Sequence, residues 1–504
     1  MQQHKEGFNR VALLTGARIF GVIFSFAIPM YLGRHLEVDT YGTYKQVTLI
    51  YWFAQVALNL GLDDSVFYFL RWDRKNFPLF SLNALVFNVL MTGFLALLMT
   101  IFRFDIAALL NNPDLAQYLP ILGYLIVVTL CSLQIEGFLI NFNRFKERLY
   151  LDAGTELLKS VAIMAAFIMF DSIFIALVLQ STLMTLRMIW MVYTMHTHKV
   201  REGVRYRDAY KFFMDQARYG LPLGVSRIVQ NILNMENLFI SSFYNVRQFT
   251  FYSVGCFENP IVNSLRTSLY ELVNIELIDN VKGKNLNKAA ETWKRMTRSL
   301  FLVVIPFTIY MMFFAKEMIV FIFSDKYLES VPYFMVFNFY IFIACLNPEP
   351  LFRSTSNTGY ALKIKIFGVI LGLGMIIGGA YYIGPMAVLW GKILAVAFIN
   401  ISGLFIGARL LQTNILDLFM WKDLGKTVFL SVVFAIIARA AFYNLTWHPF
   451  WVLAASSSAY AVFYFFFACR INLVRREEAE HLFSMVKKLF IKLRLVKKIE
   501  VAHD

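Results

Sequence analysis

Charged residues are scarce in this chain, and acidic ones are the scarcer kind. Only 16% of the 504 residues are charged, with 33 Asp or Glu against 48 Lys or Arg, while 59% are hydrophobic. Soluble globular chains carry about 25% charged residues, so the composition excludes an ordinary soluble fold. Apolar runs of about twenty residues, long enough to cross a hydrocarbon layer, recur along the chain. The sequence therefore predicts an all-α polytopic membrane protein.

Cysteine is equally scarce and carries no pattern. The four cysteines lie far apart at positions 131, 256, 345 and 469. Neither a disulfide framework nor a zinc site has such spacing. We therefore expect no metal and no cofactor, with coupling to protons or sodium left open.

Apolar runs between charged or turn-rich breaks predict about fourteen transmembrane helices. Their expected ranges are 11–33, 44–69, 79–101, 117–140, 153–170, 173–195, 219–241, 249–274, 299–323, 331–352, 363–383, 386–408, 427–444 and 450–469. Basic connections alternate with short, nearly uncharged ones. By the positive-inside rule, both termini are cytoplasmic. Most of the net charge of +15 thus orients the helices, and we expect no nucleic-acid partner.

An internal repeat divides the chain. An offset of 208 carries Tyr44 onto Tyr252 and Gln55 onto Asn263. Six spans per copy would keep both copies in the same orientation, as in parallel-repeat transporters. The predicted parts are an N-terminal lobe at 1–198, a C-terminal lobe at 199–410, spans 13 and 14 at 411–469, and a basic amphipathic cytoplasmic tail at 470–504. The tail is expected to lie on membrane lipids of the inner leaflet.

Ionisable side chains inside spans are costly, so they mark cavities or partners. The basic ones are Arg18, Lys159, Arg187, Arg227, Arg266, Lys392 and Arg439. The acidic ones near span ends are Asp63, Asp64, Glu136 and Glu258. Each acid either handles a coupling ion or pairs with a nearby base. The same two roles are expected for four of the bases, Lys159, Arg187, Lys392 and Arg439.

Polar side chains recur at helical spacing on three spans, which places them on single helix faces. The second span carries Tyr44, Tyr51, Gln55 and Asn59; the seventh carries Arg227, Asn231 and Asn234; the eighth carries Asn259, Asn263 and Arg266. A single polar residue in a span usually forms a hydrogen bond to a neighbouring helix, but whole stripes of them predict a water-filled cavity. We expect a hydrated, positively charged cavity bounded by spans 1, 2, 7 and 8.

Short motifs resemble a known family. They are 14–18 (LTGAR), 32–34 (LGR), 39–44 (DTYGTY), 59–63 (NLGLD) and, opening the second half, 219–223 (YGLPL). They are similar to the Wzx-type polysaccharide-repeat flippases of the multidrug/oligosaccharidyl-lipid/polysaccharide exporter superfamily. The resemblance implies two six-helix bundles in a V around a cationic lumen, faced by Arg18, Arg227 and Arg266.

The same resemblance implies an activity and partners. A lipid-linked oligosaccharide, held on polyprenyl pyrophosphate, would cross from the cytoplasmic to the outer leaflet of a bacterial inner membrane. Such oligosaccharides are precursors of O-antigen, capsule or exopolysaccharide. A polysaccharide polymerase and other envelope-assembly proteins would be its partners.

Two other functions stay open. A cation-coupled multidrug exporter of the same superfamily would need buried carboxylates, but no acidic residue lies between Arg10 and Leu36 in the first span. An integral-membrane enzyme acting on lipid-linked sugars would need a large outward loop, but the outward connections are short. The sequence therefore favours a transporter over an enzyme.

Overall fold

The computed structural model describes most of the chain. The described residues are 26–61, 65–66, 68–69, 76–141, 144–197, 209–355, 357–443 and 447–474. Most of the first predicted span, with Arg18, lies outside them. So do Asp63, Asp64 and the amphipathic tail from residue 475 onward.

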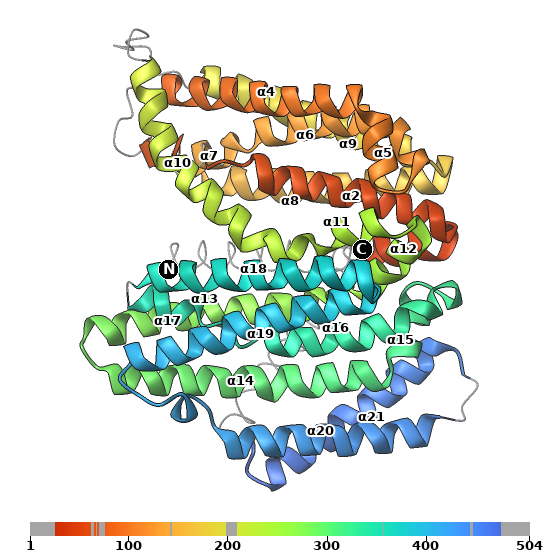
Figure 1. The fold of residues 1–504 in the computed structure, drawn as a ribbon, viewed down its shortest axis with the longest axis vertical. Coiled ribbons are helices and arrows are strands. Elements are labelled where there is room, and N and C mark those ends of the chain that lie inside the picture. The colour runs from red at the N-terminus through yellow and green to blue at the C-terminus, as the bar shows by residue number, and fades with distance from the viewer. Residues whose placement is uncertain are drawn as a thin grey trace, which may run out of the picture. The chain divides into compact units, whose positions relative to one another are not determined.

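Helices make up the regular structure of the described residues (Figure 1). The α-helices are α2 (Val38–Leu58), α4 (Phe77–Ile101), α5 (Arg103–Leu109), α6 (Leu119–Ser132), α7 (Gln134–Asn141), α8 (Phe145–Phe170), α9 (Ile173–Thr197), α10 (Ala209–Asn231), α11 (Glu236–Phe243), α12 (Val246–Gly255), α13 (Pro260–Lys282), α14 (Leu286–Phe313), α15 (Ala315–Ile322), α16 (Val331–Ala344), α17 (Glu349–Ser354), α18 (Thr358–Tyr382), α19 (Pro385–Leu410), α20 (Trp421–Phe442) and α21 (Pro449–Arg470). The short 3₁₀ helices are η2 (Pro113–Gln117), η4 (Ile232–Met235), η5 (Asp325–Ser330) and η6 (Ile415–Leu418).

The protein is a multi-pass, all-α membrane protein. Nine helices of the described residues are long and apolar enough to cross a bilayer, and α6 is a shorter apolar helix. Every predicted span from the second to the fourteenth coincides with one α-helix or two consecutive ones. Large apolar side chains such as Phe94 and Phe367 are more than half exposed, as expected where lipid replaces water.

Several predicted spans are broken rather than continuous. The eighth divides into α12 and α13, and Pro260 is the first residue of α13. Proline has no backbone N–H and disfavours the helical conformation of the residue before it. The first residue of a helix needs no N–H partner, so a helix readily starts at a proline. The seventh span divides at η4, between α10 and α11. Broken helices at membrane depth occur where the freed backbone is buried in protein or lines a cavity.

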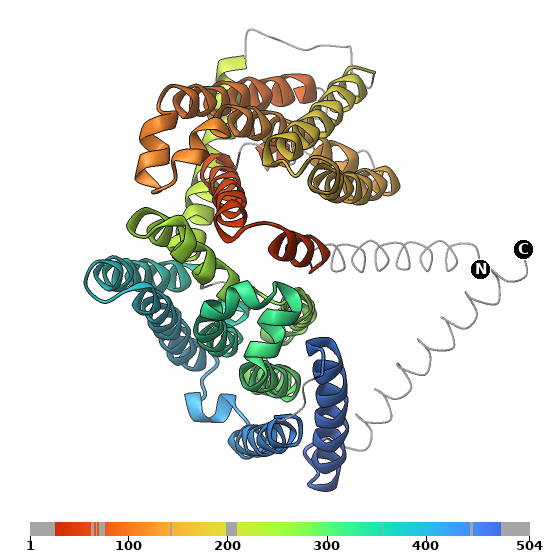
Figure 2. The same ribbon diagram turned by 90° about the vertical axis from the view of Figure 1, so that its right-hand side faces the viewer.

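Contacts divide the chain into two compact units. The first comprises 1–261, 322–333 and 362–398, and the second comprises 262–321, 334–361 and 399–504. In the first unit α4, α6 and α9 pack side by side (Figures 1 and 2). Below them, Ala84, Ile135, Phe138 and Met191 form a buried apolar cluster that joins α4, α7 and α9.

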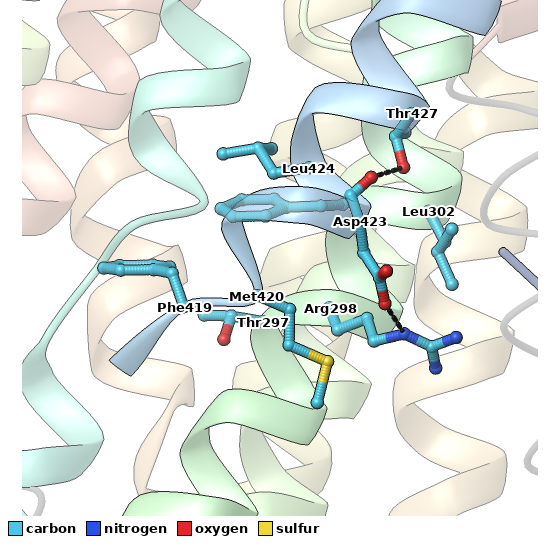
Figure 3. A pocket seen from close by; sticks show the side chains of 9 residues that line it. Thr297, Arg298, Leu302, Phe419, Met420, Asp423, Leu424 and Thr427 are labelled. Carbon is cyan, nitrogen blue, oxygen red and sulfur yellow. Dashed lines mark hydrogen bonds and ion pairs between the residues drawn. The ribbon is translucent and has the colours of Figure 1, made fainter. Parts of the chain in front are cut away.

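The second unit is built on α14, α20 and α21. Buried apolar and tyrosine side chains, among them Tyr310 and Tyr460, fill the space between these helices. Figure 3 shows Asp423 of α20 directed at Arg298 of α14. The Arg298 Nε donates to Asp423 Oδ2 at 2.7 Å, and its Nη2 donates to the Leu473 carbonyl at 2.6 Å. One buried guanidinium thereby ties α14 to α20 and to the segment after α21.

The start of α12 supports the internal repeat. The helix α2 begins at Val38 and α12 begins at Val246, 208 positions later, which is the offset that the sequence predicts. The two helices pack against each other in the first unit. Whereas α2 continues to Leu58, α12 ends at Gly255.

Candidate functional site

Two predicted site residues from distant parts of the chain meet. Asn59 directly follows α2, and Arg227 lies in α10. The Arg227 Nη1 donates to Asn59 Oδ1 at 3.1 Å. One helical turn further on, the Asn231 side chain donates to the Arg227 carbonyl at 2.9 Å. The stripes of the second and seventh spans therefore face each other at this point.

Glycines bring the backbones together beside this hydrogen bond. Gly61 has φ +79°, and a Cβ there would overlap the carbonyl oxygen of Gly220. A Cβ on Gly224 would lie 2.5 Å from the Cα of Leu60, where no side chain fits. Small residues allow helix backbones to approach closely in membranes. The motifs 59–63 and 219–223, which carry the family resemblance, thus contact each other.

We expect Gly224→Ala to push α10 away from Leu60 and so separate Arg227 from Asn59. Overpacking of a close contact costs about 1–3 kcal/mol. The melting temperature in detergent should therefore fall, and the transport rate per folded protein should fall as well. Gly93→Ala in α4 is the matched control, because a Cβ there meets nothing within 4 Å. Equal behaviour of the two variants would refute the close contact.

Aromatic faces lie next to the glycine contact. The rings of Tyr68 and Tyr219 stack with centroids 4.5 Å apart and planes 17° apart. Their exposed fractions are 36% and 37%. An open aromatic face with a polar tip suits a ligand that has both apolar and hydroxyl surfaces.

The other residues of the α2 stripe contact neighbouring helices of the first unit. The Tyr51 hydroxyl donates to Thr129 Oγ1 of α6 at 3.2 Å. The Tyr44 ring meets Phe167 of α8 edge-on, with centroids 5.6 Å apart. Gln55, between Tyr51 and Asn59, is half-buried. The stripe is therefore a partly buried polar track.

Lys45 is a cation on α2 that the sequence analysis missed. Its Nζ lies 5.5 Å above the centroid of the Tyr41 ring. In the part of the chain that the structure describes, no carboxylate forms an ion pair with it. The predicted span began at Tyr44, which put Lys45 at its edge. Because α2 begins at Val38, Lys45 lies two turns inside the helix.

The eighth-span residues fall on both sides of the helix break. Glu258 and Asn259 lie between α12 and α13, where Glu258 is exposed and Asn259 is buried. In the second unit, the Arg266 Nη2 donates to Asn263 Oδ1 at 3.0 Å. Asn234, in η4, is exposed. Both breaks thus occur at polar residues of the predicted stripes.

Four of the predicted intramembrane cations form ion pairs with carboxylates. The pairs are Lys159 with Glu156 at 2.8 Å, Arg187 with Asp152 at 3.1 Å, Lys392 with Glu236 at 2.7 Å and Arg439 with Glu317 at 2.6 Å. A carboxylate at this distance neutralises most of the cation's field, so these four cations are less suited to an anionic ligand. The pair of Lys392 and Glu236 is the most buried of them, with side chains 6% and 1% exposed.

Glu136 and possible metal sites complete the set of predicted features. Glu136 lies in α7, but its side chain lies outside the described ones. No group of three or more His, Cys, Asp or Glu side chains among the described residues has a metal-binding arrangement. The candidate site itself is made of cations, amides and tyrosines.

Comparisons with known proteins agree with this architecture. The profile of a family described as "Polysaccharide biosynthesis protein" matches residues 31–332. No curated protein matches the sequence.

Solved structures share the fold at low identity. The chain is similar to a lipid II flippase, MurJ, in an inward closed conformation, with 15% identity, coverage of 91% of this chain and 99% of that one, and a TM-score of 0.67. It is also similar to a multidrug resistance MATE family transporter of the MOP superfamily in an inward-facing conformation, with 14% identity, coverage of 79% and 94%, and a TM-score of 0.56. A eukaryotic MATE transporter matches with 14% identity, coverage of 84% and 98%, and a TM-score of 0.51.

Proposed function

Because the chain belongs to the polysaccharide biosynthesis protein family, we propose that it is a flippase for a polyprenyl-pyrophosphate-linked oligosaccharide. The observation that carries this proposal is the polar track of α2 and α10. Arg227 and Lys45 lie on or beside this track, and no acidic residue occurs from Lys45 to Asn59. Cations at these positions, with no acidic residue from Lys45 to Asn59 on α2, favour an anionic head group over a cationic drug.

The diphosphate is the part of such a substrate that needs these cations. Its charge must leave water to cross the bilayer interior, and fixed arginines replace that water with charge-assisted, often bidentate hydrogen bonds. Arg227 would bind the diphosphate from the first unit. Arg18 and Arg266 are proposed as further cations of the lumen, and Asn231, Asn234, Asn259 and Asn263 as further polar residues that bind the head group.

The saccharide needs weaker and more numerous contacts. Tyrosine rings offer faces for sugar rings, and amides such as Gln55 and Asn59 offer donors and acceptors to hydroxyl groups. The stacked rings of Tyr68 and Tyr219 are partly exposed, and Tyr219 precedes Gly220, which contacts Gly61. The lipid tail remains in the bilayer throughout.

Transport would follow alternating access. Rocking of the lobe at 1–198 against the lobe at 199–410 would expose the head group to one leaflet and then the other. The breaks at η4 and between α12 and α13 supply places where helices bend without losing further backbone hydrogen bonds. This transport needs no organic cofactor, and protons or sodium are the proposed coupling ions.

The distribution of basic residues among the connections supports one orientation of the protein in the membrane. We propose that the protein spans the inner membrane of a bacterium with both termini in the cytoplasm, and the basic connections on one side support this orientation. The oligosaccharide would be the repeat unit of an O-antigen, capsule or exopolysaccharide. A polymerase that consumes the flipped product is the proposed partner on the outer side.

A reconstituted assay tests the proposal. Full-length protein in proteoliposomes should move lipid-linked oligosaccharides, extracted from the native host, to the leaflet where an added glycosidase reaches them. Empty liposomes are the control. Efflux of a cationic dye without lipid movement would establish the drug exporter instead, and chemical conversion of the lipid-linked sugar would establish the enzyme.

A further inference from the structure

A closed aromatic cluster lies near the start of α2, away from the contact between Asn59 and Arg227. The Tyr41 ring of α2 meets the Tyr327 ring of η5 edge-on, with centroids 5.9 Å apart. Phe251 of α12 meets Tyr327 at 6.3 Å, and Phe323 meets Tyr41 at 6.3 Å. All four rings are at most 3% exposed. The cluster therefore joins segments of both predicted lobes within the first unit.

The polar atoms of this cluster are not satisfied. The hydroxyls of Tyr41, Tyr327 and Ser330 are buried without a hydrogen-bond partner among the described residues. These side chains are 1%, 0% and 0% exposed. Buried polar groups almost always have a partner, and each orphan costs about 1–3 kcal/mol. Two orphans in the cluster and a third, Ser330, at the end of the same 3₁₀ helix as Tyr327, indicate that these hydroxyls serve something besides the stability of this closed arrangement.

The structural tyrosines of the same chain behave differently. The Tyr310 hydroxyl lies 2.9 Å from Ser456 Oγ, and the Tyr460 hydroxyl donates to the Pro306 carbonyl at 2.9 Å. Both belong to the apolar cluster of α14, α20 and α21. The hydroxyls of these two tyrosines, which hold helices together, are therefore satisfied.

Two further features mark the cluster as a place that opens. A Cβ on Gly42 would overlap Thr250 Oγ1 and lie 2.6 Å from Val246 Cγ1, so side chains of α12 pack directly against the backbone of α2 at that point. Ser324, just before η5, has φ 125°, which is strained for a residue with a Cβ. Strained backbone concentrates at ligand clamps and switch regions.

We propose that Tyr41, Tyr327 and Ser330 form a saccharide-binding subsite that is shut here and opens when α2 separates from α12 and η5. The inference rests on the proposed function and adds a second binding place on the path. Opened, the two tyrosines present ring faces to sugar rings and hydroxyls to sugar hydroxyls. Lys45, above the Tyr41 ring, places a cation where the diphosphate adjoins the first sugar.

Removing single hydroxyls tests the subsite. Tyr41→Phe, Tyr327→Phe and Ser330→Ala in the full-length protein should leave the melting temperature unchanged or raise it, because an orphaned buried hydroxyl disappears. The same variants should slow flipping of host-extracted lipid-linked oligosaccharide about five- to tenfold, the equivalent of one lost hydrogen bond to a sugar. Tyr310→Phe is the matched control, with a lower melting temperature and normal flipping per folded protein.

Each other outcome overturns the subsite. A lower melting temperature with normal flipping would show that bound water satisfies the hydroxyls and that their role is structural. Normal flipping at an unchanged melting temperature would show that they do not contact the substrate. Absence of flipping by the wild-type protein would instead refute the proposed function, on which the subsite depends.

Discussion

Replacing Arg227 with alanine is expected to slow flipping about a hundredfold while the protein still folds and reaches the membrane. Arg227 donates one hydrogen bond to a neutral amide, Asn59, and a bond of that kind contributes about 0.5–1.5 kcal/mol. A desolvated bond to a diphosphate is stronger, and losing it costs about 2–5 kcal/mol. The loss should therefore be larger in transport than in the melting temperature.

Two companion variants sharpen this expectation. Arg227→Lys keeps the charge but loses bidentate geometry, so an intermediate rate is expected. Arg218→Ala is the matched control on the same helix, since that side chain is 82% exposed and 3.9 Å from Asp215. Arg266→Ala and Arg18→Ala should resemble Arg227→Ala. Normal flipping by all three alanine variants would rule out a cationic lumen.

Replacing Lys392 with methionine is expected to have the largest effect on stability. Its Nζ lies 2.7 Å from Glu236 Oε1, and both side chains are nearly inaccessible. Removing one member of a buried ion pair leaves an uncompensated charge and costs about 3–5 kcal/mol. The variant should therefore be poorly recovered from membranes and should melt at a lower temperature than the wild type.

The double variant Lys392→Met with Glu236→Leu separates two roles of this pair. An apolar pair of similar volume is often as stable as the buried ion pair, so recovery of the melting temperature is expected. A stable double variant that still flips its substrate would make the pair structural. A stable but inactive one would assign it to energy coupling. Failure of the double variant to regain stability would contradict the ion-pair account.

The helical periodicity of polar side chains was the most informative part of the sequence. It placed Asn59 and Arg227 on cavity-facing stripes, and the structure brings these two residues together across 168 positions. The eighth predicted span contains Pro260, and it breaks there. These features depend on local rules, namely helix geometry and the missing N–H of proline.

Other features depend on which helices become neighbours, and no local rule reveals that. The pairing of Glu236 with Lys392 joins residues 156 positions apart on different helices. Lys45 was overlooked because hydropathy began the second span at Tyr44, whereas α2 begins at Val38. The break at η4 contains no proline, so nothing in the sequence of 232–235 announced it.

The contact between Gly61 and Gly220 also has a mechanical consequence. Side chains that interlock as ridges and grooves must change rotamer or unpack before two helices can turn against each other. Here the backbone of Gly220 lies where a side chain of Gly61 would be, so neither residue interlocks with the other. At this contact α10 can therefore rotate against the end of the second span while the two backbones stay in contact.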